Sequence, residues 1–182
     1  MCIRDRPRGS RRQFSIAAVL ENTPSGPQGP FVHPGTFIVR LTVDGVTSEK
    51  PLEVRLDPRV DISEEALQLQ TDLSLRCYEG YLAAQEIREA VEGALDTADE
   101  ERRAALEALR GEGEPGEPDV LYDAIYAAAP TDETLVDLQY KFLWTMYVLQ
   151  NADARPTTQT KEAVALLERR LGDLFQRWED LR

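Results

Sequence analysis

The chain has 182 residues, a formal net charge of −12 and 42% hydrophobic residues. This composition is typical of a globular protein and excludes a disordered chain. The negative charge argues against a nucleic-acid partner, because affinity for phosphates rests on Lys and Arg. The sequence lacks a run of about 18 apolar residues, so it predicts no membrane insertion.

The first residues differ from the acidic remainder of the chain. The hexapeptide Met1 to Arg6 resembles a translated sequencing-adapter remnant, and the following residues up to Arg12 are also rich in Arg. We expect residues 1–13 to be such an artefact or a disordered leader. The alternative, a basic arm for nucleic acid or a membrane, lacks an amphipathic pattern.

A β-hairpin is the clearest local prediction. Residues 36–43 alternate strictly, with Phe37, Val39, Leu41 and Val43 on one face. Asp44-Gly45 predicts the turn. Residues 52–56 alternate again, with Leu52, Val54 and Leu56 on the same apolar face, and Pro51 favours a sheet edge or a strand start.

The rest of this β unit is less regular. A Pro- and Gly-rich loop over residues 22–35 precedes the hairpin, and residues 14–20 are a candidate for an earlier strand. An isolated two-stranded hairpin is marginal in water. The sequence therefore indicates that the hairpin belongs to a larger β unit, of which residues 14–60 are a part.

From residue 61 to residue 182 the pattern becomes helical. Apolar residues recur at steps of three and four, which is typical of helices that bury one face. The predicted helices cover residues 63–95 with Ser63 as N-cap, residues 96–110 as a continuation or a separate helix, residues 120–128, residues 131–150 with Thr131 as cap, and a last helix from Thr157 or Thr158 to Leu181. We predict an antiparallel three-helix or irregular four-helix bundle, which makes the chain α+β.

The apolar stripes of this bundle follow from the same spacing. In the first helix the stripe is Leu73, Cys77, Gly80, Ala84, Ile87, Val91 and Leu95. In the last helix it is Val164, Leu167, Leu171, Leu174, Trp178 and Leu181. The helix over residues 131–150 carries so many large apolar residues that we expect burial on several sides.

Groups for catalysis are scarce. His33 is the one histidine and is predicted to be an exposed loop residue, and Cys77, on an apolar stripe, is predicted to be a small buried hydrophobe rather than a reactive thiol. The carboxylate pairs at residues 64–65, 99–101 and 132–133 lie at predicted helix starts, where the helix dipole explains them. We therefore predict no catalytic, cofactor-binding or metal-binding residue, and no enzymatic activity of this chain.

The aromatic residues have two interpretations. Tyr, Phe and Trp side chains gathered on one surface are able to form a platform for carbohydrate stacking. Trp144 and Trp178 lie on or beside the apolar stripes, so core packing is the interpretation that we prefer.

Three stretches carry a family resemblance. Residues 29–45 read Gly-Pro-Phe-Val-His-Pro-Gly-Thr-Phe-Ile-Val-Arg-Leu-Thr-Val-Asp-Gly, and residues 51–59 read Pro-Leu-Glu-Val-Arg-Leu-Asp-Pro-Arg. Residues 149–158 read Leu-Gln-Asn-Ala-Asp-Ala-Arg-Pro-Thr-Thr. Together with the Trp-Glu-Asp-Leu at residues 178–181, these resemble the C-terminal region of large bacterial BNR-repeat glycosyl hydrolases and sortilin-like β-propeller proteins.

The resemblance covers residues 14–182 and implies a role outside catalysis. It implies a parent with propeller blades, an immunoglobulin-like sandwich that ends in this hairpin, and the helical end, secreted or periplasmic. The family's repeats and catalytic residues have no counterpart here, so the chain is expected to be a non-catalytic accessory module whose partners are the parent's upstream domains. The alternative is a helical oligomerisation or protein-interaction module that associates with itself.

Overall fold

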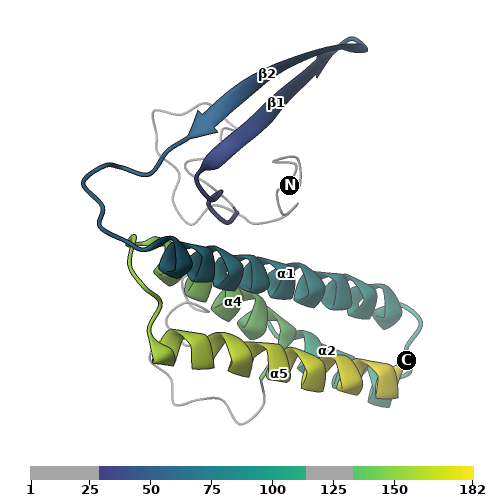
Figure 1. Cartoon of the computed structure of the whole chain (residues 1–182). Helices are drawn as coiled ribbons and strands as arrows, with labels where there is room; N and C mark the ends of the chain where they lie inside the picture. Colours follow the sequence, from purple (N-terminus) through teal and green to yellow (C-terminus); the bar gives the residue numbers. More distant parts are fainter. Residues whose placement is uncertain (1–28, 114–132) are drawn as a thin grey trace, which may run out of the picture.

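The computed structural model describes residues 29–113 and 133–182, which form a two-stranded antiparallel hairpin followed by four helices (Figure 1). The α+β prediction is therefore confirmed. The elements in chain order are β1 (Gly35–Val43), β2 (Val46–Val54), α1 (Glu64–Leu95), α2 (Glu100–Arg110), α4 (Leu135–Gln150) and α5 (Thr158–Leu181). The candidate strand at residues 14–20 and the candidate helix at residues 120–128 lie outside the described residues.

The hairpin turn is the one that the sequence predicts. Asp44 and Gly45 both have positive φ, 50° and 79°, which is the type I′ geometry that matches the twist of two antiparallel strands. The turn pairs Val43 with Val46, so β2 begins directly after it. The prediction that the second strand starts at residue 52 is wrong, because β1 holds residues 46–51 in the ladder although they do not alternate.

The first helix begins where the sequence predicts. The Ser63 side chain accepts a hydrogen bond from the Ala66 N–H at 3.2 Å, and Glu64 and Glu65 occupy the first turn. α1 has 32 residues and therefore spans about 48 Å. It ends at Leu95, and Asp99 caps a separate α2 by accepting from the Arg102 N–H at 2.9 Å, so the helix breaks there rather than continuing.

The start of α4 differs from the prediction. The cap is Thr134 rather than Thr131, and Thr134 forms a reciprocal capping box with Asp137. The Asp137 N–H donates to Thr134 Oγ1, and the Thr134 N–H donates to an Asp137 carboxylate oxygen, both at 3.2 Å. Two threonines lie within three residues, and only the one with an acidic residue three positions later completes the box. Of the two predicted candidates for the cap of α5, Thr157 and Thr158, Thr157 is the cap and Thr158 is the first helical residue.

The bundle has three antiparallel segments, which we call legs: α1 forms the first, α2 followed by α4 forms the second, and α5 forms the third. Gly111, directly after α2, lies against the Thr134 side chain at the start of α4, so α2 and α4 follow one another along one leg. Arg102 at the start of α2 donates to the Leu181 carbonyl at the end of α5, which sets these two helices antiparallel. The four helices therefore pack as a three-legged bundle (Figure 1).

The core lies where the three legs meet. The predicted stripes are buried in α1 and α5, although Leu95, Leu171 and Leu181 at their margins are only partly buried. The fully buried side chains of α4 continue this core. The largest fully buried apolar side chains are Phe142, Leu73, Leu106, Leu109, Leu135, Leu138, Val91, Val136 and Val164.

The closest approach in the core joins α1 to α4. A Cβ added at Gly80 would overlap the ring of Phe142, which is fully buried, so the ring lies directly on the helix backbone. At the end of α4, the Gln70 side-chain amide donates to the Leu149 carbonyl and, at 2.7 Å, to the carbonyl of Ala152, just after the helix. These contacts set α1 and α4 antiparallel.

The Gly80 contact gives a matched pair of substitutions in one helix. Gly80→Ala is expected to lower the free energy of unfolding by about 1–3 kcal/mol, because the new methyl group forces the Phe142 ring or the helix to move. Gly93→Ala meets no atom within 4 Å and should raise it by up to about 1 kcal/mol through helix propensity. Urea unfolding of both variants measures the difference, and equal effects would contradict this account.

Candidate functional site

The hairpin carries an apolar face that the strand register defines. Residues directly opposite in an antiparallel ladder share one face. The register pairs Phe37 with Leu52 and Val43 with Val46. We name the apolar residues on this side the hairpin apolar face, and its members are Phe37, Val39, Leu41, Val43, Val46, Leu52 and Val54. The same register places Ser48 opposite Leu41 and Lys50 opposite Val39, so these two polar residues lie on this side as well.

Within the described part of the chain, no element covers this face. Val39, Leu41, Val43, Val46 and Leu52 are between 46% and 73% exposed. Neither strand packs on a helix, and the hairpin projects away from the bundle (Figure 1). Predicted Leu56 is not in the strand, since β2 ends at Val54. The other side chains on this side, apart from Ser48 and Lys50, are apolar, and an exposed apolar patch of this kind is typical of a surface that another element or molecule covers.

The opposite face of the hairpin carries Ile38 and Pro51 beside polar side chains that contact one another across the strands. Arg40 donates to the Glu49 carboxylate across the strands at 2.6 Å, and the Thr42 and Thr47 hydroxyls are 3.0 Å apart. Such cross-strand pairs contribute about 0.2–1 kcal/mol each. The hairpin is thus stabilised by its turn and by these polar pairs, while its apolar face remains open.

Two contacts tie the root of the hairpin to the bundle. The Phe31 N–H donates to the side-chain oxygen of Gln150 at the end of α4. His33 Nε2 lies 3.3 Å from a Glu64 carboxylate oxygen at the start of α1, an ion pair when the imidazole is protonated. The His33 side chain is only 21% exposed, so the prediction of an exposed loop residue is wrong. The His33 side chain thus connects the loop before β1 to the start of α1.

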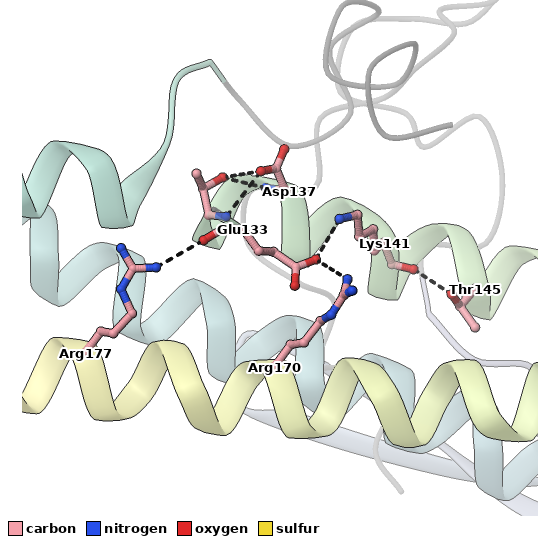
Figure 2. Close-up of polar contacts among 7 residues, drawn as sticks. Glu133, Asp137, Lys141, Thr145, Arg170 and Arg177 are labelled. Atoms are coloured by element: carbon pink, nitrogen blue, oxygen red, sulfur yellow. Dashed lines mark hydrogen bonds and ion pairs between the residues drawn. The ribbon is translucent and has the colours of Figure 1, made fainter. Parts of the chain in front are cut away.

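A partly buried ion cluster joins α4 to α5 (Figure 2). One carboxylate oxygen of Glu133 receives Lys141 Nζ at 2.6 Å and Arg170 Nη1 at 3.0 Å, and the Glu133 side chain is 12% exposed. Arg177 Nη1 lies 3.5 Å from the Glu133 carbonyl. Glu133 lies before the N-cap Thr134 and therefore outside the first turn of α4, where the sequence predicted it to lie. Its carboxylate pairs with two cations from two helices.

The cluster is consistent with a structural role. Two cations hold one carboxylate oxygen of Glu133, and Asp137 accepts hydrogen bonds from Thr134. Because Lys141 belongs to α4 and Arg170 to α5, these contacts attach α5 to the start of α4.

Glu133→Gln removes the charge that the two cations share. We expect the free energy of unfolding to fall by about 1–3 kcal/mol, less than for a fully buried pair, because Arg170 is 34% exposed. Glu65→Gln is the matched control, since Glu65 and its partner Arg155 are 81% and 64% exposed, and a change within about 0.5 kcal/mol is expected. Chemical denaturation compares them, and similar losses would contradict a special role for Glu133.

A second interhelical pair joins α1 to α5. Arg76 donates to both carboxylate oxygens of Glu168, at 2.7 and 2.5 Å. These hydrogen bonds lower the pKa of Glu168 below its usual value. Because the folded pKa is the lower one, the pair stabilises the fold above the unfolded pKa, and this contribution is lost as the pH falls through the folded pKa. Both side chains are more than a third exposed, so the contribution is small.

Cys77 lies in the core of α1 and is fully buried, which confirms the prediction of a small buried hydrophobe. Burial raises the pKa of the thiol to about 12, and the neighbouring Glu168 carboxylate adds to the rise. Only the thiolate is a nucleophile, so the protonated Cys77 thiol is unreactive near neutral pH.

Thiol labelling tests this directly. In a Cys2→Ser background at about pH 8, we expect native Cys77 to react with iodoacetamide at least about a hundredfold more slowly than the urea-unfolded chain, because burial and protonation both protect it. Mass spectrometry follows the adduct over time. Equal rates in the native and unfolded chain would show that Cys77 is accessible and ionised.

The remaining predicted residues are distributed over the bundle. The acidic residues at 64–65 and at 100–101 lie in the first turns of α1 and α2, as expected from the helix dipole. Within residues 29–113 and 133–182, no group of three or more His, Cys, Asp or Glu side chains is placed to hold a metal ion. None of the described helices is both long and apolar enough to cross a membrane.

The two tryptophans differ in burial. Trp178 is buried in the core, as predicted. Trp144 is 39% exposed and stacks between Tyr140 and Tyr147, with ring centroids 6.4 and 5.5 Å away. The prediction that α4 is buried on several sides is therefore wrong for its outer face, where Tyr147 and Val148 are also exposed. Helical spacing shows that a residue is apolar but not whether a neighbour covers it.

Comparisons with protein-family models, with curated proteins and with solved structures find no match to this chain.

Proposed function

We propose that this chain is a non-catalytic structural module at the C-terminal end of a larger exported protein, of the BNR-repeat or sortilin-like β-propeller class that its sequence resembles. In this proposal the hairpin is the last part of an immunoglobulin-like sandwich. The upstream domains of the parent cover the hairpin apolar face, and the helical bundle forms the end of the molecule.

The open hairpin apolar face is the observation that carries this proposal. Five of its seven side chains, those of Val39, Leu41, Val43, Val46 and Leu52, are about half exposed or more. Its members in β1 nevertheless alternate as in a buried strand. Burying apolar surface contributes roughly 25 cal/mol per Å², so covering several such side chains stabilises a sandwich by several kcal/mol. A second sheet about 10 Å away is the usual cover for an amphipathic antiparallel hairpin.

The bundle supports the same role. Caps stabilise the starts of single helices, and the Glu133 cluster and the Arg76–Glu168 pair join one helix to another. The hairpin root is fastened to the bundle by Phe31 and His33. This arrangement favours a rigid end-piece that presents a hairpin for packing.

Amide hydrogen exchange tests whether the hairpin apolar face has a cover in the parent. In this chain at dilute concentration, we expect amides of Val39 and Leu41 to exchange faster than core amides of α1, because opening the hairpin disrupts little packing. In a chain extended upstream by its own coding sequence, the same two amides should exchange at least about tenfold more slowly.

Two outcomes of this experiment would count against the proposal. Unchanged exchange of Val39 and Leu41 in the extended chain would show that the parent leaves the face open. Slower exchange confined to α4 around Trp144 and Tyr147 would favour the second candidate, a helical interaction module, which the exposure of these two aromatic side chains supports.

A further inference from the structure

The turn geometry determines which backbone groups of the hairpin face outward. In a two-residue turn the flanking residues, here Val43 and Val46, exchange the closing hydrogen bonds. Bonded and non-bonded pairs then alternate along an antiparallel ladder. The residues of β1 at non-bonded positions, which direct their N–H and C=O groups outward, are therefore Thr36, Ile38, Arg40 and Thr42.

The two edges of the hairpin differ. On β2, Pro51 pairs with Ile38 and so occupies a non-bonded position, where its missing N–H interrupts the outer edge. The β1 sequence, GTFIVRLTV, contains no proline. Proline on an edge strand is one way in which proteins prevent pairing, and an uninterrupted edge is a template for another strand. The β1 edge is therefore the one that is able to accept a strand.

We propose that the outer edge of β1 pairs antiparallel with β1 of a second copy of this chain, in a two-fold register centred on Val39. The register places Thr36 opposite Thr42 and Ile38 opposite Arg40 of the second copy, and it uses every outward-facing position of the strand. Phe37 lies opposite Leu41, so the two hairpin apolar faces join on one side of a four-stranded sheet.

Charge repulsion disfavours one neighbouring register, and the loss of a paired residue disfavours the other. Moving the two-fold centre to Arg40 would place two guanidinium groups opposite each other, which is destabilising. Moving it to Ile38 would leave Thr42 without a partner in the other strand. Arg40 is the one charged residue within β1, and Glu49 neutralises it at 2.6 Å, so two β1 strands approach without local repulsion.

Strand number also favours the pairing. A two-stranded hairpin is marginal in water, whereas three or more strands with an apolar face form a stable sheet. The proposal goes beyond the structural role proposed above, because it uses the edge of β1 and not the hairpin apolar face. Exchange of Val39 and Leu41 reports on the face, and the experiments below report on the edge, so either proposal is able to fail alone.

A cysteine at the two-fold centre tests the register. Opposed Cα atoms of a non-bonded pair are about 4.5 Å apart, within the range of a disulfide. In a Cys2→Ser background of the full chain, we expect Val39→Cys to form a covalent dimer under mild oxidation. Leu41→Cys is the matched control on the same face, since its copy would lie about 13 Å away along the strand.

The two cysteine variants distinguish strand pairing in the proposed register from random collision of two chains. Leu41 is 63% exposed and Val39 is 46% exposed, so random encounters would favour the Leu41→Cys dimer. A covalent dimer at least tenfold more abundant for Val39→Cys supports the proposal. Equal or greater yields for Leu41→Cys overturn it.

A pair of proline substitutions tests the edge without cysteine chemistry. Thr42 and Thr47 are cross-strand partners at non-bonded positions, so either substitution loses the same hydroxyl contact. Thr42→Pro blocks the β1 edge, and Thr47→Pro blocks the β2 edge. In sedimentation velocity at about 1–100 μM, Thr42→Pro should weaken dimerisation at least tenfold, and Thr47→Pro less than twofold. The proposal is overturned if the chain without these substitutions is monomeric throughout this range, or if the two proline substitutions have equal effects.

Discussion

The packing of the Phe142 ring on the backbone at Gly80 is the contact on which the bundle depends. Because no side chain separates the ring from the backbone of α1, α1 and α4 approach closely at this point, and the Gln70 amide binds the end of α4. Once α1 and α4 are held antiparallel, the remaining groove accepts the apolar stripe of α5. The Glu133 cluster and the Arg76 pair hold α5 there.

The hairpin is held by a different kind of interaction. Its turn, its ladder and its polar cross-strand pairs are all local. Among the described residues, Phe31 and His33 of the loop before it contact the bundle. Helices that share a core lose their packing together, whereas a hairpin outside the core opens at its own lower cost. The same separation leaves the hairpin apolar face and the β1 edge available to other strands and sheets.

The sequence predicted helix caps and the hairpin turn well, because these features depend on residues that are close in the chain. Ser63 and Thr157 cap their helices, and the Asp44-Gly45 turn forms, because each needs only residues three or fewer positions away. Features that depend on distant partners were missed. Glu133 was assigned to a helix dipole, yet Arg170 lies 37 residues away, and no periodicity indicates that pairing. A glutamate two residues ahead of a helix with basic residues at several later positions was the signal available.

The sequence pattern and the tertiary structure determined different features of this protein. Apolar spacing was sufficient for the α+β class, the positions of the helices and the burial of Cys77, since these follow from which residues avoid water. The joining of α2 and α4 into one leg, the exposure of Trp144 and the open hairpin apolar face were decided only by tertiary structure. The physical reason is that an apolar side chain records a preference for burial, while burial itself requires a neighbour, and a neighbour is a property of the folded chain.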